Sequence, residues 1–246
     1  MKYSVIIPAR YESSRLPGKP LVKLEGKAMI LRTHEQCTAA CDPKRVFVAT
    51  DDSRVQSVCA ANGVQVIMTS PDCATGTDRV AECATHLDSD VFINVQGDEP
   101  LAAPDDILRC IELKAERPEY IINGFCWIGP DEDPSSVNIP KVITNEKGIM
   151  VYMSRKPLPG FKDAGNAPDG YMKQVCIYGF SRRDLQDFAG FERKSALEQS
   201  EDIEILRFLE LERPVMMYAC QPGSLAVDVP EDIPKVEQAL RAAYPE

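Results

Sequence analysis

The chain has 246 residues, of which 44% are hydrophobic and 27% are charged, and its formal net charge is -10. These totals indicate a globular protein that is long enough to bury a substantial core. The negative charge excludes a general electrostatic grip on nucleic acid, although it leaves room for local cationic loops. No apolar stretch is long enough to span a bilayer, and the apolar run before Arg10 is too short for a signal peptide.

The nine cysteines are scattered along the chain. No CxxC occurs, and the pair Cys37 and Cys41 is not followed by a His or Cys pair at zinc spacing. We therefore predict structural or incidental thiols. Free thiols fit a reducing cytoplasm better than a disulfide scaffold.

The first half of the chain alternates between predicted strands and predicted helices. Strands are expected at Tyr3–Ala9, Arg45–Asp51, Val64–Thr69 and Ser89–Pro100. Helices are expected at Lys27–Cys41, Ser53–Gly63, Thr75–Leu87 (opened by Thr77 or Asp78) and Ala103–Ala115. Alternation with nearly continuous apolar strands predicts an α/β fold, with a parallel sheet covered by helices on both faces. In such sheets ligands bind beyond the carboxyl ends of the strands.

From about Tyr120 the pattern becomes mixed. Strands are expected at Tyr120–Gly129, at two places within Pro140–Arg155 joined by a turn at Glu146–Gly148, and at Lys173–Ser181, Val215–Gln221 and Ser224–Pro230. Helices are expected at Ser200–Glu212 and Pro230–Tyr244. The second half of the sheet is therefore predicted to be mixed and partly antiparallel.

Positive charge is concentrated in "PARYESSRLPGKPL", directly after the first predicted strand. Arg10, Arg15 and Lys19 can oppose a triphosphate, and Ser13, Ser14 and backbone N–H groups can donate hydrogen bonds to it. The alternative is a solvated basic loop, but the position at the ligand edge of a parallel sheet favours binding. The dinucleotide fingerprint GxGxxG and the P-loop spacing are both absent, which argues against a dehydrogenase and a P-loop kinase.

Carboxylates follow two other apolar stretches. "NVQGDEP" supplies Gln96, Asp98 and Glu99 at the end of a strand, where a carboxylate can hold Mg²⁺ or simply form a polar turn. "AVDVPEDI" supplies Asp228, which would complete a two-carboxylate magnesium site with Asp98. "ATGTDR" at a helix entry is either a helix cap or a loop that faces a nucleobase.

The order of these motifs resembles that of the CMP-Kdo synthetases, the 3-deoxy-manno-octulosonate (Kdo) cytidylyltransferases. The resemblance runs from Lys2 to about Val236 and is carried by "IIPARYESSRLPGKPL", "VATDD", "MTSPDCATGTDRVAE", "NVQGDEP", "YMSR", "IYGF", "LEQSEDIEILR" and "VDVPEDI". It implies one Rossmann-like nucleotidyltransferase domain of the GT-A type over residues 1–246, with a sugar-binding and dimerisation subregion at 120–190. It also implies a cytoplasmic homodimer that uses CTP, Kdo and Mg²⁺ in lipopolysaccharide biosynthesis.

The resemblance further implies roles for individual residues. Arg10, Lys19 and Asp98 would be catalytic, and Asp98 and Asp228 would hold the metal. The residues implied to bind CTP are Pro8, Ala9, Arg10, Ser13, Lys19, Met68, Thr75, Gly76, Arg79 and Gln96. Those implied to bind the sugar are Gln96, Arg155, Gln174, Tyr178, Glu198 and Glu201.

This chain departs from the family pattern on the sugar side. Gln174 stands where the family commonly has a histidine, "ERKSA" replaces the usual entry to "LEQSEDIEILR", and Asp202 is unusual at its position. The nucleotide side is nearly intact. The alternatives are therefore another acid sugar, such as 8-amino-Kdo or a nonulosonic acid, a neutral sugar phosphate, or a non-catalytic nucleotide-binding module.

Overall fold

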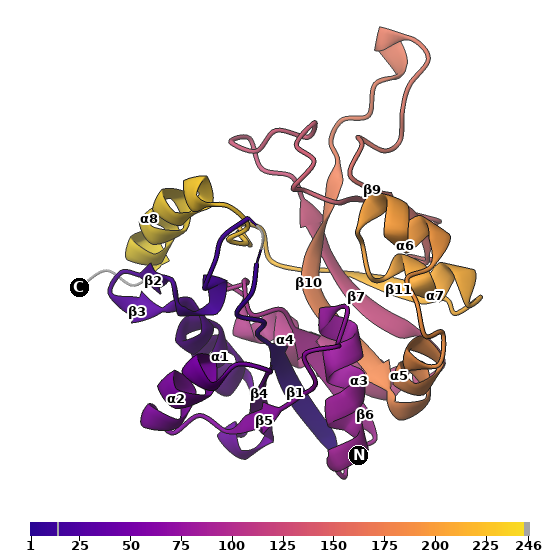
Figure 1. Cartoon of the computed structure of the whole chain (residues 1–246). Coiled ribbons are helices and arrows are strands. Elements are labelled where there is room, and N and C mark those ends of the chain that lie inside the picture. The colour runs from indigo at the N-terminus through magenta and orange to yellow at the C-terminus, as the bar shows by residue number, and fades with distance from the viewer. Residues whose placement is uncertain (14, 244–246) are drawn as a thin grey trace.

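The computed structural model describes residues 1–13 and 15–243 of the chain. Its centre is a nine-stranded sheet with the order β11-β7-β10-β6-β1-β4-β5, to which β8 and β9 are added beside β10 (Figure 1). The strands are β1 (Tyr3–Pro8), β4 (Val46–Thr50), β5 (Val66–Met68), β6 (Val91–Val95), β7 (Ile121–Trp127), β8 (Lys141–Thr144), β9 (Met150–Ser154), β10 (Met172–Ser181) and β11 (Val215–Ala219). Ser14 and the predicted helix end at Tyr244 lie outside the described residues.

Eight α-helices surround the sheet in the described part of the chain. They are α1 (Met29–Ala40), α2 (Ser53–Ala61), α3 (Gly76–His86), α4 (Pro104–Glu116), α5 (Arg182–Ala189), α6 (Ala196–Glu201), α7 (Leu206–Glu210) and α8 (Ile233–Ala243). Within residues 1–13 and 15–243, none of the helices combines the length and the apolar character needed to cross a membrane.

The first half of the sheet is parallel, as predicted. β1 pairs in parallel with β4 and β6, and β4 pairs in parallel with β5. Of these strands, β1, β4 and β6 are mostly apolar and largely buried, because helices cover both faces of the sheet, whereas the edge strand β5 is partly exposed. The carboxyl ends of β1, β4, β5 and β6 consequently meet at one edge.

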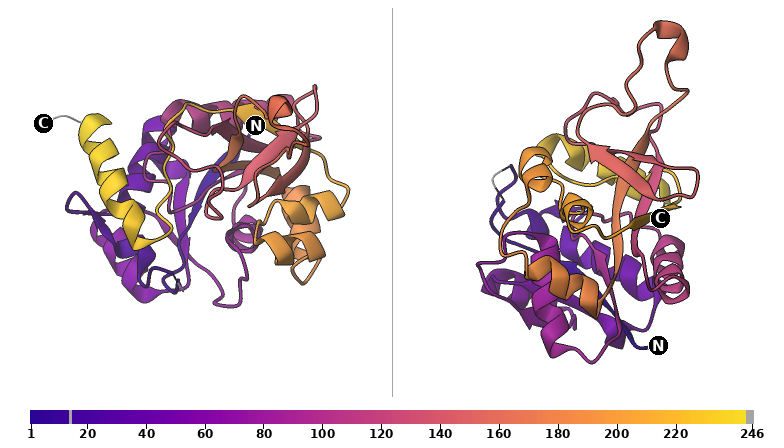
Figure 2. Two further views of the ribbon diagram at one scale, coloured as in Figure 1. Left: turned by 90° about the horizontal axis from the view of Figure 1, so that it is seen from above. Right: turned by 90° about the vertical axis from the view of Figure 1, so that its right-hand side faces the viewer.

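The second half is mixed, also as predicted. β10 runs antiparallel to β6, β7 and β8, whereas β11 runs parallel to β7. The segment 155–171 between β9 and β10 extends away from the body of the molecule (Figures 1 and 2). The side chain of Phe161, within this segment, is exposed.

Several local features differ from the predictions. No strand is described at 224–230, where the backbone N–H of Val227 instead donates to the carbonyl of Asp98. Thr75, rather than Thr77 or Asp78, is the N-cap of α3, and its hydroxyl accepts from the Asp78 N–H. A short hairpin, β2 (Lys23–Leu24) with β3 (Lys27–Ala28), was not expected.

The predicted helix Ser200–Glu212 is interrupted. α6 ends at Glu201, its C-cap Asp202 has a φ of 50° in the left-handed region, and α7 begins only at Leu206. The carbonyls of Glu201 and Asp202 accept hydrogen bonds from the guanidinium of Arg155 instead of from the next helical turn. A tertiary contact therefore ends a helix whose apolar spacing continues in the sequence.

Three apolar clusters hold the layers together. The first packs α1, α2 and α4 on one face of the sheet, and the second packs α3, α5 and residues 203–208 on the other. We call the third the hinge cluster; it consists of Leu16, Leu24, Met29, Val227, Val236 and Leu240. Because it joins the basic loop to the C-terminal segment, it brings two distant stretches of sequence to the same edge of the sheet.

The N-cap of α5 offers a test of this fold. The hydroxyl of Ser181 accepts from the N–H of Asp184, and the carboxylate of Asp184 accepts from the N–H of Ser181, which completes a capping box. We expect Ser181→Ala to lower the free energy of unfolding by about 1 kcal/mol in urea titrations. The matched control is Ser57→Ala, since the exposed hydroxyl of Ser57 only bonds the Ser53 carbonyl within α2; it should change stability by less than about 0.5 kcal/mol. Equal losses in the two variants would contradict the capping role.

Candidate active site

A cavity of about 840 Å³ opens at the carboxyl edge of the parallel strands. Its walls come from the loop after β1, the loop after β6, the start of α3, the first half of β10 and the segments 131–140, 194–204 and 224–236. Segments from both halves of the chain thus meet at the edge where α/β sheets bind ligands.

The basic loop that follows β1 is folded around Gly18. Gly18 has a φ of 70°, its N–H donates to the Tyr11 carbonyl at 3.1 Å, and its carbonyl accepts from the Leu21 N–H at 2.8 Å. A Cβ at this position would lie 3.1 Å from the Tyr11 hydroxyl, so glycine suits both the conformation and the space. The Arg54 guanidinium stacks 3.4 Å from the Tyr11 ring centre on the other side. This packing fixes the turn from which Lys19 projects.

Lys19 binds both of the predicted metal ligands. Its Nζ lies 2.5 Å from Asp98 Oδ2 and 3.0 Å from Asp228 Oδ1. Burial alone would lower the pKa of Lys19, but the carboxylates of Asp98 and Asp228 raise it above its ordinary value. Lys19 is therefore a permanent cation at the centre of the cavity.

The path of the C-terminal segment explains why the two aspartates meet. Val227 N–H donates to the Asp98 carbonyl at 3.0 Å, and the Val227 side chain is buried in the hinge cluster. Asp232 then accepts from the N–H groups of Asp228 and Val229 at 2.9 and 3.0 Å. Gly97 permits the close approach of the β6 loop, since a Cβ there would lie 2.8 Å from the Pro8 carbonyl.

The carboxylates of Asp98 and Asp228 suit a hard divalent cation. One cationic group, the Lys19 ammonium, already contacts both of them, so a single cation can bridge the pair. Within residues 1–13 and 15–243 no group of three or more His, Cys, Asp or Glu side chains is arranged to hold a metal. Two carboxylates nevertheless fit Mg²⁺, which usually binds one or two protein carboxylates together with water and substrate phosphates.

Most residues predicted to bind the nucleotide line the cavity. They are Pro8, Ala9, Arg10, Ser13, Lys19, Thr75, Gly76, Arg79 and Gln96. Met68 is not among the lining residues, although its side chain is exposed beside the cavity edge at the end of β5. Arg79 is 2% exposed, and its guanidinium binds Thr69 and Asp51, so it braces the wall rather than offering a free charge.

The residues predicted to bind the sugar divide into two groups. Arg155, Gln174 and Tyr178 line the cavity. Glu198 does not, because it is 1% exposed and both its oxygens accept from Arg207 at 2.7 Å. Glu201 does not line it either, since its carboxylate accepts from the Ser154 hydroxyl and the Arg155 N–H. Neither glutamate faces the cavity in this arrangement.

Arg155 holds together the part of the cavity that is predicted to bind the sugar, through hydrogen bonds to backbone carbonyls. Its guanidinium donates to the carbonyls of Val137, Glu201 and Asp202. The buried ammonium of Lys141 donates to the carbonyls of Arg155 and Ser136, which ties the same loops together. Burial, with the charge of Arg155, lowers the pKa of Lys141.

A bulge in β10 lies between two residues that line the cavity, Gln174 and Tyr178. The pairing of β10 with β7 shifts between Val175 and Tyr178, and Asn123 donates to the carbonyls of Val175 and Ile177 across the irregularity. The side-chain amide of Gln174 donates through Nε2 to Asn123 Oδ1 at 3.0 Å. Burial raises the pKa of Tyr178 well above its ordinary value, so its hydroxyl stays protonated at neutral pH.

Sequence reasoning missed several lining residues, including Lys194, Glu204, Lys173 and Asn138. Lys194 and Glu204 belong to "ERKSA" and "LEQSEDIEILR", so their segments were recognised although these positions were not. Lys194 lies just before α6, and Glu204 lies in the break between α6 and α7, so neither position follows from helical spacing.

A parallel sheet edge with a cationic loop and two convergent aspartates defines a nucleotidyltransferase class of site, and comparison with known proteins agrees. A cytidylyltransferase family model matches residues 4–216. A 3-deoxy-manno-octulosonate cytidylyltransferase of Syntrophotalea carbinolica is 38% identical, with 98% of this chain and 99% of the relative covered. An 8-amino-3,8-dideoxy-manno-octulosonate cytidylyltransferase of Shewanella baltica is 37% identical with the same coverage.

The fold of a solved structure supports the same family assignment. The structure of CMP:2-keto-3-deoxy-manno-octonic acid synthetase complexed with CTP has a TM-score of 0.89 and 33% identity, and covers 99% of this chain and 100% of its own. The chain therefore belongs to the cytidylyltransferase family, among the CMP-Kdo synthetases and their 8-amino relatives, and is a CTP-dependent nucleotidyltransferase.

Proposed function

We propose that this enzyme transfers CMP from CTP to the anomeric hydroxyl of Kdo, giving CMP-Kdo and pyrophosphate for lipopolysaccharide biosynthesis. The observation that carries the proposal is the Lys19–Asp98–Asp228 cluster in a cavity that Arg155 also lines. The names of the full-length relatives support an eight-carbon acid sugar as the acceptor. A non-catalytic module is not retained, because the family consists of cytidylyltransferases.

The charges in the cavity address the main difficulty of this reaction, which joins two anions. The anomeric oxygen attacks the α-phosphorus, the bond to the bridging oxygen of pyrophosphate breaks, and the hydroxyl proton is released. Arg10 and Lys19 would neutralise the triphosphate, and backbone N–H groups of the basic loop would orient it. Mg²⁺ held by Asp98 and Asp228 would supply Lewis-acid stabilisation of the phosphate charge. None of the described residues that line the cavity is a histidine, so they offer no imidazole as a general base. Lys19 is the cation that contacts both aspartates.

Arg155, Lys194 and Lys173 line the cavity and would be the cations near the acceptor. Arg155 would act on the sugar chiefly by holding residues 137, 201 and 202 in place, and its remaining N–H groups could reach the carboxylate. Gln174 and the protonated Tyr178 would donate to sugar hydroxyls. Glu198 and Glu201 are not assigned to the sugar hydroxyls, because their carboxylates already accept hydrogen bonds from Arg207 and Ser154, respectively.

A pyrophosphate-release assay tests the function. Purified enzyme with CTP and Mg²⁺ should release pyrophosphate with Kdo as acceptor, and the same assay should include 8-amino-Kdo, nonulosonic acids and neutral sugar 1-phosphates. A higher kcat/KM for 8-amino-Kdo than for Kdo would move the proposal to that sugar. Turnover with a sugar 1-phosphate but with no acid sugar would overturn it.

The side chain of Arg155 gives a sharper prediction. Arg155→Lys keeps the positive charge but cannot fork between three backbone carbonyls, so the loops on the sugar side should loosen. We expect the KM for the acid sugar to rise about tenfold, as for the loss of one charged hydrogen bond, while the KM for CTP changes less than about twofold. Equal rises in the two constants, measured by initial rates, would remove Arg155 from the sugar side.

We also propose a cytoplasmic homodimer that associates through residues 120–190. Large exposed apolar side chains fall within this range, namely Trp127, Val137, Val151 and Phe161. The nine free thiols fit the reducing cytoplasm. Sedimentation of the wild type as a dimer and of Trp127→Asp as a monomer would support the interface, and a monomeric wild type would refute it.

A further inference from the structure

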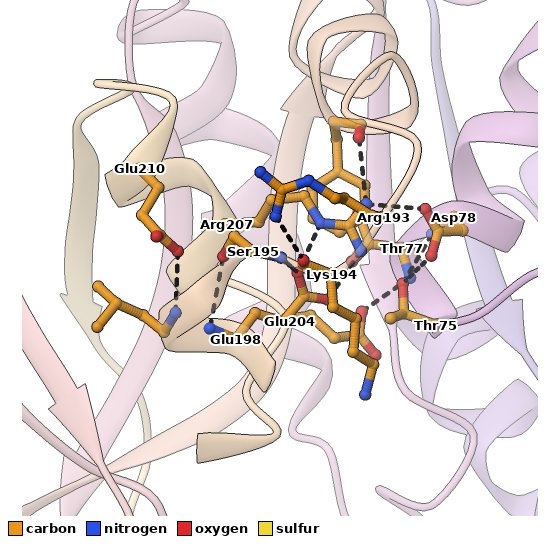
Figure 3. A network of polar contacts seen from close by, with 12 residues as sticks. Thr75, Thr77, Asp78, Arg193, Lys194, Ser195, Glu198, Glu204, Arg207 and Glu210 are labelled. Atoms are coloured by element: carbon orange, nitrogen blue, oxygen red, sulfur yellow. Dashed lines mark hydrogen bonds and ion pairs between the residues drawn. The ribbon is translucent and has the colours of Figure 1, made fainter. Parts of the chain in front are cut away.

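The first turn of α3 is held by the charged side chains of Glu204 and Arg207 (Figure 3). Glu204 accepts from the N–H groups of Gly76 and Thr77 at 3.0 and 2.8 Å. Arg207 donates to Asp78 at 3.1 Å. A carboxylate suits the free N–H groups and the positive end of a helix dipole. The start of α3 is therefore attached to residues 204–207 as well as capped by its own Thr75.

This attachment is firmly built. Arg207 is 2% exposed; besides Asp78 it binds both oxygens of Glu198 and the Phe188 carbonyl, and its guanidinium lies 3.6 Å from the Phe188 ring centre. The geometry is bidentate on Glu198, which restrains the guanidinium more than a single contact would. Burial raises the pKa of Glu204, while the N–H groups of Thr77 and Gly76 oppose that rise.

The turn that is held in this way lines the nucleotide side of the cavity. Thr75 and Gly76 are lining residues, and Gly76 packs so closely on Gln96 that a Cβ would lie 2.5 Å from Gln96 Nε2. A shift of the first turn of α3 would thus displace all three residues. Lys194 and Asp202, from the segment that holds this turn, line the same cavity.

We propose that Glu204 and Asp78 are positioning residues for the nucleotide: they fix Thr75 and Gly76 against the segment 194–207, so that affinity for CTP and discrimination against UTP depend on that segment. The inference rests on the proposed function and on the role in CTP binding that the family resemblance implies for Thr75 and Gly76. Discrimination between bases requires polar groups at fixed positions, so loosening this turn weakens it.

Asp78→Asn is the most informative variant, because Asp78 does not itself line the cavity but accepts from both Arg207 and the hydroxyl of the lining residue Thr75. We expect its Kd for CTP, measured by calorimetry without acid sugar, to rise about tenfold, since a charged hydrogen bond to Arg207 is lost. The ratio of kcat/KM for CTP over UTP should fall, while kcat at saturating CTP changes little. Glu204→Gln should act in the same direction, because its amide nitrogen cannot accept from a backbone N–H.

The matched control is Glu210→Gln, an exposed carboxylate at the end of α7 whose hydrogen-bond partners are Ser195, Ala196 and Leu197 at the start of α6 and not residues of α3. It should keep the wild-type Kd and base preference, and thermal unfolding should show that all three variants are folded. Wild-type CTP affinity in folded Asp78→Asn would overturn the proposal, as would a Glu204→Gln variant in which only the acid-sugar KM rises. If Asp78→Asn does not fold, Glu204→Gln decides alone. A wild-type enzyme that binds no CTP would instead contradict the proposed function itself.

Discussion

Lys19→Ala should lower turnover by about 10²–10³-fold, because it removes a preorganised cation from the centre of the cavity. The loss has two physical parts. The triphosphate would lose a positive partner, and Asp98 and Asp228, which now share the ammonium, would repel both each other and the phosphates. We therefore expect weaker CTP binding in calorimetry as well as a lower kcat in the pyrophosphate-release assay.

The control for this variant is Lys23→Ala. Lys23 is exposed in β2, only a few residues further on, and does not line the cavity. Its removal changes the net charge by the same amount, so it should leave kcat and CTP affinity within about twofold of wild type. Parallel losses in Lys19→Ala and Lys23→Ala would point to a general charge effect and not to a site residue.

Asp98→Asn should reduce kcat by about 10²–10³-fold while leaving the fold intact. The contact that fixes the neighbouring C-terminal segment uses the backbone carbonyl of Asp98, which the substitution preserves. An amide of the same shape cannot neutralise Lys19 or offer a charged ligand to a divalent cation. In contrast to Lys19→Ala, affinity for CTP without metal should not fall, since a negative charge has been removed from beside the phosphates.

Asp105→Asn is the matched control for Asp98→Asn. Asp105 lies exposed in the first turn of α4 and accepts one hydrogen bond from Gln221, away from the cavity lining. It should retain kcat within about twofold. A folded Asp98→Asn enzyme with normal kcat would remove Asp98 from the catalytic group.

The parallel half of the fold could be predicted because its signals are local. β6 is a fully buried and mostly apolar strand that ends at Val95, and α4 begins at Pro104 with acidic residues in its first turn. The same locality explains the successful placement of the basic loop at the ligand edge. The pairing of Asp98 with Asp228 is suggested by the chemistry of a two-carboxylate metal site and by the family resemblance. No local pattern predicts it, because the bond from Val227 to Asp98 and the hinge cluster join residues far apart in sequence.

The errors arise where a tertiary contact overrides a local pattern. Ile203, Leu206 and Leu209 continue a helical spacing through Asp202, yet Arg155 binds the carbonyls there and the chain turns. The family motif predicts that Glu198 binds the sugar. Its partner Arg207 lies in the next helix, α7, and holds the Glu198 carboxylate in the core. The same break directs Glu204 to α3, which no periodicity in the sequence indicates.

The most direct measurement for the central claim is a titration with Mn²⁺ in the presence of CTP, followed by electron paramagnetic resonance. If Asp98 and Asp228 together hold the divalent cation beside the bound nucleotide, wild type and Asp105→Asn should show the same stoichiometric bound Mn²⁺ signal. The double variant Asp98→Asn/Asp228→Asn should lose the protein-bound signal and leave only that of Mn²⁺–CTP in solution. Retention of the wild-type signal by a folded double variant would contradict the account, because the cation would then be held elsewhere.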